Sequence, residues 1–178
     1  MALNSSAIPS RTLDDTITFR RPTHHDGAAM WRLVRDSGAL DENSAYAYLM
    51  MGEWFADTCV VAEDGPSSRL AGFVMGFVPP RQPDTLFVWQ VGVDHQHRGR
   101  GLGLRLLTQL IAEAPPPVRF LEATVTPSNA ASEALFGAAA RAHDAAIEIT
   151  DLFGSDAFPG TGHEPERRFR IGPILRHA

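Results

Sequence analysis

An apolar strand, a glycine-rich loop and an amphipathic helix follow one another in the middle of the sequence. The strand Thr85–Val93 is almost continuously apolar, as expected for a central strand that is covered on both faces. The helix continues to about Glu113 and carries leucines at helical spacing on one face: Leu102, Leu106 and Leu110. A unit of this kind predicts a sheet that packs against helices.

The loop between this strand and helix has glycine at every second position: Gly99, Gly101 and Gly103. Without a Cβ atom, the backbone of such a loop can turn tightly and approach a ligand closely. Unpaired N–H groups at a helix start, together with the helix dipole, favour an anion, and Arg98 and Arg100 lie close by. The loop therefore predicts a site for a diphosphate group.

The other segments show strand and helix periodicities. Further strands are predicted over Ile17–Arg21, Thr58–Glu63, Leu70–Val78, Phe120–Val125, Ala146–Thr150 and Arg167–Ile171. Further helices are predicted near residues 23–37, 43–55 and 128–140. Turn-forming residues at 64–68 join two strands into an antiparallel hairpin, which excludes a wholly parallel sheet. The order predicts an α/β (α+β) fold, with a mixed central sheet flanked by helices on both faces.

Length and composition narrow the class of protein. The 178 residues fit one domain, which we place at residues 16–178 after a disordered polar arm at 1–15. The net charge of −5 argues against binding to nucleic acid. No apolar stretch resembles a signal peptide or a membrane span, so we expect a cytoplasmic protein without membrane contact. The single cysteine, Cys59, lies in an apolar run and is expected to be an inert core residue.

Three interpretations compete for the glycine-rich loop. A P-loop needs a lysine, and all sixteen basic residues here are arginines. A dinucleotide-binding loop is weakened because Leu104 stands where its third glycine belongs, although Glu122 lies at a tolerable distance for a ribose contact. The run Arg98–Gly103 matches fully the Arg/Gln-x-x-Gly-x-Gly/Ala pattern and resembles the GCN5-related N-acetyltransferases.

A second segment, Asn129–Phe136, resembles the Asn-x-x-Ala-x-x-Leu-Tyr motif of the same superfamily. The resemblance implies that acetyl-CoA binds to residues of the central strand, the loop and this segment: Val91, Val93, Arg98, Gly99, Arg100, Gly101, Gly103, Asn129, Ser132 and Phe136. One position departs from the motif, because Phe136 replaces a tyrosine that in many members protonates the leaving thiolate. Another acid must act, or the thiolate leaves unaided.

Four further segments resemble the diaminobutyrate acetyltransferases of the ectoine pathway, in order and over nearly the whole chain. They are residues 40–48, 86–93, 124–129 and 162–166. The resemblance implies acetyl transfer to the 4-amino group of L-2,4-diaminobutyrate, giving N4-acetyl-L-2,4-diaminobutyrate, and it implies a homodimer. A different small diamine or amino acid as acceptor, or a non-catalytic nucleotide-binding module, are the alternatives.

A diamino acid needs carboxylates around its ammonium groups, and polar or aromatic walls. The expected substrate-binding residues are Asp41, Glu42, Asn43, Tyr46, Trp89, Gln90, His163, Glu164 and Glu166. Because an ammonium cannot attack a thioester, a base is required. We rank Glu166 first and His163 second, with a water held by Asp41 and Glu166 as a further route.

Structural roles compete for some of these residues. Acids before a helix, such as Asp41 and Glu42, often serve its dipole, and a tryptophan on a central strand, such as Trp89, is often core. Residues 163–166 lack the His-Glu-x-x-His spacing of zinc sites, so no metal is expected.

Overall fold

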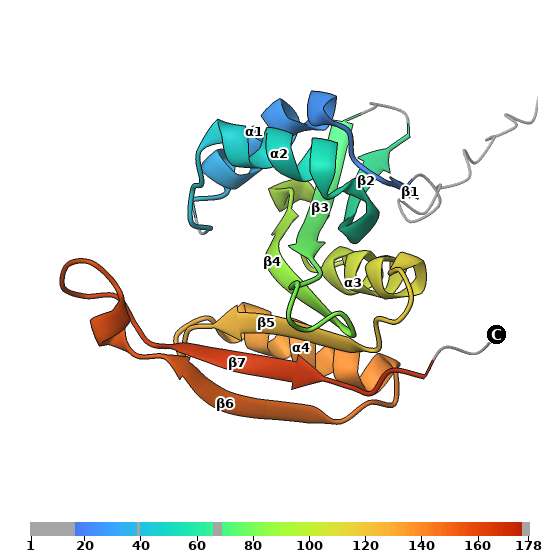
Figure 1. Ribbon diagram of the computed structural model, residues 1–178. Coiled ribbons are helices and arrows are strands. Elements are labelled where there is room, and N and C mark those ends of the chain that lie inside the picture. Colours follow the sequence, from blue (N-terminus) through green and yellow to red (C-terminus); the bar gives the residue numbers. More distant parts are fainter. Residues whose placement is uncertain (1–16, 39, 66–68, 176–178) are drawn as a thin grey trace, which may run out of the picture.

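The computed structural model describes residues 17–38, 40–65 and 69–175, so the expected arm at 1–15 lies outside the described residues. Within these residues, seven strands form one sheet in the order β1-β2-β3-β4-β5-β7-β6 (Figure 1). The strands are β1 Ile17–Arg20, β2 Cys59–Asp64, β3 Arg69–Phe77, β4 Thr85–Val93, β5 Phe120–Val125, β6 Ile147–Phe153 and β7 Glu166–Ile171. Of the described strand pairs, only β4 and β5 pair in parallel, which confirms the predicted mixed sheet.

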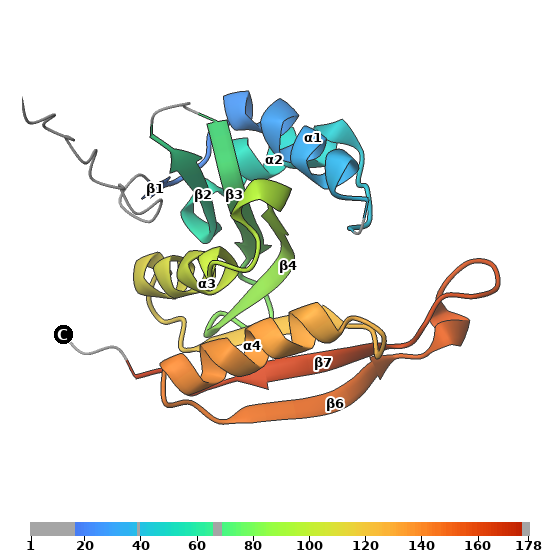
Figure 2. The same ribbon diagram turned by 180° about the vertical axis from the view of Figure 1, so that it is seen from behind.

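In the described part of the chain, four α-helices cover the sheet: α1 Gly27–Ser37, α2 Ala45–Trp54, α3 Leu102–Glu113 and α4 Ala130–Ala142. The helices α1 and α2 lie on one face of β2–β4, and α3 lies on the other, with α4 beside it over β5 and β7 (Figure 2). Successive side chains of β2 point to opposite faces of the sheet. Val60 packs into the core under α3, whereas Val61 packs into the core under α1 and α2.

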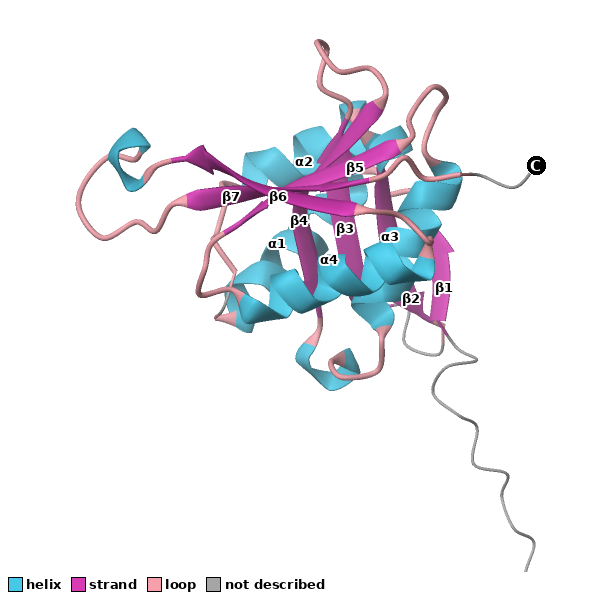
Figure 3. Ribbon diagram, turned by 90° about the horizontal axis from the view of Figure 1, so that it is seen from below, coloured by secondary structure: helices cyan, strands magenta, loops and turns pink. Residues whose placement is uncertain are grey.

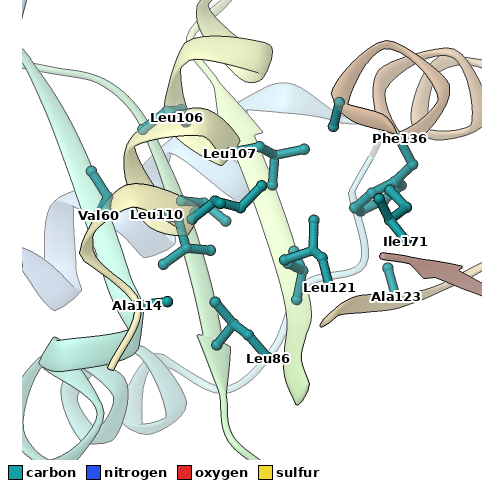
Figure 4. Close-up of a cluster of buried hydrophobic side chains, with 14 of the residues drawn as sticks. Val60, Leu86, Leu106, Leu107, Leu110, Ala114, Leu121, Ala123, Phe136 and Ile171 are labelled. Atoms are coloured by element: carbon teal, nitrogen blue, oxygen red, sulfur yellow. The ribbon is translucent and has the colours of Figure 1, made fainter. Parts of the chain in front are cut away.

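The larger core lies under α3 and α4. Leucines of α3, among them Leu106 and Leu110, pack against Leu86 and Leu121, and Phe136 of α4 packs near Ile171 (Figure 4). These side chains are buried, and the helical spacing of the leucines puts them on the face toward the sheet.

The smaller core lies under α1 and α2 and contains Met30, Tyr48, Phe73 and Cys59. Cys59 is buried, as expected, and this burial raises the pKa of its thiol to about 12. A thiol in this state stays protonated and unreactive near neutral pH.

The strands β4 and β5 separate halfway along β4. Their pairing begins at Thr85 with Phe120 and ends at Val88 with Ala123, whereas β4 continues to Val93 along β3. The two strands diverge beyond this point (Figure 1). The sheet therefore opens into a fork between its two halves.

A β-bulge lies at the same position. On β3, Met75 pairs with Gln90 and the next residue, Gly76, pairs with Val88, so Trp89 is the extra residue of β4. Because a bulge shifts the alternation of side chains, Gln90 faces α1 and α2 while Val88 faces α3.

The strands β6 and β7 form the far end of the sheet, and the loop between them extends away from the rest of the molecule (Figure 3). The strand β6 reaches Phe153 and is longer than the sequence pattern predicts, because pairing with Glu166 of β7 continues past a bulge. None of the described helices is long and apolar enough to cross a membrane.

Candidate active site

A cavity of about 280 Å³ lies at the fork between β4 and β5. Nine of the predicted site residues line it: Asp41, Asn43, Trp89, Gln90, Val91, Asn129, Ser132, Phe136 and Glu166. Segments that are far apart in the sequence thus meet here, from the α1–α2 connection, β4, α4 and the start of β7.

The α4 side of the cavity is formed by the first two turns of that helix. Asn129 caps α4, since its side-chain oxygen accepts a hydrogen bond of 3.0 Å from the backbone N–H of Ser132. This cap fixes the first turn of α4, so that Ser132 and Phe136, four residues apart, share the face toward the fork. The buried Phe136 ring contributes an apolar wall but no proton.

The glycine-rich loop continues this side at the end of β4. Gly99 and Gly101 have φ values of +72° and +75°, in the left-handed region that glycine tolerates. A Cβ atom at either position would meet nothing within 4 Å, so the backbone here faces open space. Arg98 holds the loop to β4, because its Nε donates to the carbonyl of Val93 at 3.1 Å.

The start of α3 supports the predicted diphosphate site. Gly101 is the N-cap of α3 and has no side chain to satisfy the first N–H groups of the helix. A diphosphate can accept hydrogen bonds from these groups, with Arg100 exposed beside them. At Gly103, a Cβ would lie 3.4 Å from the side chain of Leu135 of α4, an ordinary contact distance.

The opposite side of the cavity is built by the α1–α2 connection. Asp41 and Asn43 line it, and Trp89 stands beside them, 41% exposed rather than in the core. The first turn of α2 contains no acidic residue, so Asp41 lies at the cavity and not on the helix dipole.

Tyr48, on this side, is not among the site residues predicted from the sequence. Tyr48 of α2 is fully buried, and its hydroxyl donates to Oε1 of Gln90 at 3.0 Å. The Nε2 of Gln90 in turn donates to the backbone carbonyl of Asp41 at 2.9 Å. The helical spacing of Tyr48 with Met51 indicates burial, and a buried tyrosine hydroxyl needs a partner, but the sequence does not say which.

The third wall comes from β7 and its approach. Glu166, the first residue of β7, lines the cavity together with Thr124 and Thr126 of the β5 end. A carboxylate therefore stands across the fork from residues 40–44, here called the Asp41 segment.

Other predicted residues lie outside the cavity lining in this chain. His163 lies on the β6–β7 loop, where its ring stacks on Phe158 at 3.6 Å and its Nδ1 is 2.6 Å from the carbonyl of Glu164. The carboxylate of Glu164 accepts from the backbone N–H of Ser128 at 3.0 Å, so it orders the loop before α4. Glu42 is exposed, and Tyr46 is 61% exposed on α2.

The structure argues against a dinucleotide-binding loop, because Glu122, the acidic residue expected to bind the ribose, has another partner. Glu122 is buried and pairs with Arg170, which also donates to Thr85 at 3.2 Å and stacks on Phe120. A carboxylate held in this way cannot also bind a ribose. Among the described residues, no group of three or more His, Cys, Asp or Glu side chains forms a metal site.

The chain is similar to known acetyltransferases. Residues 28–139 match the model of the Acetyltransferase (GNAT) family. The chain is 53% identical to L-2,4-diaminobutyric acid acetyltransferase of Halalkalibacterium halodurans over 95% of this chain and 88% of that protein. It is 44% identical to the enzyme of the same name from Streptomyces anulatus, over 93% of this chain and 94% of that protein.

Solved structures agree with these sequence matches. The diaminobutyrate acetyltransferase from Paenibacillus lautus, in complex with its substrate L-2,4-diaminobutyric acid and coenzyme A, superposes with a TM-score of 0.84. That protein is 43% identical, and the match covers 91% of this chain and 98% of that one. A putative phosphinothricin N-acetyltransferase, 20% identical with a TM-score of 0.65 over 90% of this chain and 99% of that one, shares the fold.

Proposed function

Because this chain belongs to the GNAT acetyltransferase family, and within it to the L-2,4-diaminobutyric acid acetyltransferases, we propose that it transfers an acetyl group from acetyl-CoA to L-2,4-diaminobutyrate. The acceptor is the 4-amino group, and the product is N4-acetyl-L-2,4-diaminobutyrate, the precursor of ectoine. The observation that carries the proposal is the cavity at the β4–β5 fork, whose lining contains the carboxylates of Asp41 and Glu166 together with residues of the α4 motif.

The cofactor side of the fork fits acetyl-CoA. The diphosphate has the open backbone of Gly99 and Gly101 and the first turn of α3, and the pantetheine arm has Asn129 and Ser132 along its path to the fork. Bound acetyl-CoA supplies an acetyl group as a thioester, which an amine can attack. Backbone N–H groups of β4 beyond Val88, where pairing with β5 has ended, can stabilise negative charge on the carbonyl oxygen.

The acceptor side suits a diamino acid. Asp41 and Glu166 supply carboxylates for ammonium groups, Asn43 supplies an amide, and Trp89 supplies an aromatic face. An acceptor that enters from this side meets the acetyl group at the fork. Transfer is then direct, within a ternary complex, without a covalent bond to the protein.

Glu166 is the general base in this proposal. It takes a proton from the 4-ammonium group, the free amine forms the new C–N bond, and the C–S bond breaks as the thiolate leaves. Since thiols have a pKa near ~8.5, the thiolate can leave without a protonated partner, which accommodates Phe136 in place of a tyrosine. His163 is the second candidate, with its Nδ1–H donating to the Glu164 carbonyl and Nε2 free to accept.

Mass spectrometry of the product formed from diaminobutyrate and acetyl-CoA tests the proposal, with fragmentation to locate the acetyl group. Acetylation of the 2-amino group would contradict the regiochemistry. Faster release of coenzyme A with putrescine or lysine than with diaminobutyrate would favour the alternative of another small diamine. Thermal stabilisation by NAD but not by acetyl-CoA would favour a nucleotide-binding module.

We further propose that the protein is a cytoplasmic homodimer. A single, buried cysteine suits a reducing compartment. Apolar side chains are exposed along β6, an edge strand, which suits contact with a second copy.

A further inference from the structure

We propose that Tyr48 and Gln90 are positioning residues that hold the Asp41 segment against the cavity and so set the affinity for the acceptor amine. The proposal rests on the proposed function, because it concerns the acceptor side of that same site. Neither residue needs to touch the reacting atoms. Their effect is exerted through residues 40–44, which form neither helix nor strand.

The contact runs through three elements. Tyr48 on α2 donates to Gln90 on β4 at 3.0 Å, and Gln90 donates to the carbonyl of Asp41, before α2, at 2.9 Å. Tyr48 is fully buried and Gln90 is 9% exposed, so water competes little for either bond. The ring of Tyr48 is held edge-on against Phe73, with 6.2 Å between ring centroids.

The hydrogen-bond partners of Gln90 allow only one orientation of its side-chain amide. A backbone carbonyl can only accept, so the NH2 group of Gln90 must face Asp41 and its oxygen must face Tyr48. The Tyr48 hydroxyl, as donor, locks this orientation of the amide. Loss of the hydroxyl would leave a buried amide oxygen without a partner and free the amide to rotate.

The bulge at Trp89 makes the contact possible. It turns Gln90 toward α2 at the point where β4 leaves β5, so the residue that anchors the acceptor segment is adjacent to the fork. The distance from Asp41 to Glu166 across the cavity therefore depends on this anchor.

Tyr48→Phe tests the proposal, because it deletes only the hydroxyl. We expect the KM for diaminobutyrate to rise roughly three- to tenfold, the size of one neutral hydrogen bond, and the KM for acetyl-CoA to change less than about twofold. Hydrogen exchange of the backbone amides at residues 40–44 should become faster. The matched control is Thr85→Val, which removes a buried hydroxyl at the other end of β4, outside the cavity lining.

Gln90→Glu is the second variant. Its carboxylate can still accept from Tyr48 but presents an oxygen to the Asp41 carbonyl, so we expect a larger rise in the diaminobutyrate KM than in Tyr48→Phe. Unchanged KM for diaminobutyrate and unchanged hydrogen exchange in either variant would overturn the proposal. It would also be overturned if Thr85→Val changed these two quantities as much as Tyr48→Phe does. A wild-type protein inactive on diaminobutyrate would instead contradict the proposed function, while exchange would still report on the anchor.

Discussion

At the scale of single residues, Glu166 is the base in the proposed reaction, and its position in the fold bears on that role. It stands at the first position of β7, where pairing with β6 fixes its backbone, and it lines the cavity opposite the Asp41 segment. A base on a strand is placed more firmly than a base on a loop. His163, on the extended β6–β7 loop, lacks that support, which is why Glu166 ranks first.

Replacement of this carboxylate has a clear expected result. Glu166→Gln keeps the shape of the side chain but cannot take a proton, so kcat should fall by roughly 10²- to 10⁴-fold while the KM for acetyl-CoA stays within about twofold. Steady-state kinetics with both substrates measures this. Glu148→Gln, at an exposed position of β6, is the control. A kcat near that of the wild type would show that Glu166 is not the base and would leave His163 as the candidate.

A glycine of the cofactor loop gives a second residue-scale prediction. Gly101 has φ +75°, which costs an L-residue about 1–2 kcal/mol, and its backbone faces the expected diphosphate. Gly101→Ala should therefore raise the KM for acetyl-CoA several-fold. Gly38→Ala meets a similar φ of +60° and equally open space at the end of α1, so it controls for strain alone. An equal rise in both variants would mean that the loop does not hold the diphosphate.

At the scale of elements, the entry to α1 depends on a carboxylate. Asp26 accepts two hydrogen bonds from Arg20 of β1, at 2.7 and 2.8 Å, and one from the N–H of Thr23, at 2.7 Å. Burial alone would raise the pKa of Asp26, but these hydrogen bonds outweigh it and hold the pKa below its ordinary value. Arg20 also pairs with Glu63 of β2, so the contact ties α1 to the edge of the sheet.

The lowered pKa gives a pH-dependent prediction. A depressed carboxyl pKa stabilises the fold above the ordinary value of 3.8, and this contribution is lost as the pH falls through the folded value. Asp26→Asn should thus lower the free energy of unfolding by about 1–2 kcal/mol at pH 7, and the difference should shrink below pH 3.8. Urea unfolding at several pH values measures it. Asp36→Asn, whose acid is exposed, should change little; an Asp26→Asn loss that persists undiminished at low pH would refute the linkage.

Sequence patterns predicted the α-helices and strands of the described residues, because apolar residues at spacings of two or about four report which face is buried. The resemblance to the acetyltransferases, and not periodicity, pointed to the predicted site residues that line the cavity. It could not predict the bulge at Trp89, since a bulge depends on the register with β3, nor the partner of Tyr48, which lies 42 residues away. The length of β6 likewise depends on pairing with β7, which local preference does not encode.

At the scale of the whole molecule, the last strand of the sheet, β6, is an edge strand in the single chain. Among the described strands, β6 pairs only with β7, so no further strand covers its outer edge, and its apolar side chains Ile147, Ile149, Leu152 and Phe153 are exposed. Long apolar edge strands attract a further strand or surface, and proteins usually cover them. A second apolar group is exposed on α2, where Trp54 is 67% exposed.

We expect the homodimer to form through β6. The double variant Ile149→Lys/Phe153→Ser places a charge and a hydroxyl on side chains that are 44% and 47% exposed in the single chain. Because both side chains already contact water in a monomer, the substitutions should leave the fold intact but prevent burial at an interface of roughly 1,200–2,000 Å². Sedimentation at micromolar concentration should show a dimer for the wild type and a monomer for the variant.

Trp54→Ser separates the two exposed surfaces, since it removes the largest apolar side chain from α2 without altering β6. If this variant dissociates and the β6 variant does not, the interface lies on α2. A wild-type protein that sediments as a monomer would contradict the dimer itself. In that case the apolar edge of β6 should lead to concentration-dependent aggregation, because unpaired strand edges associate without a closed geometry.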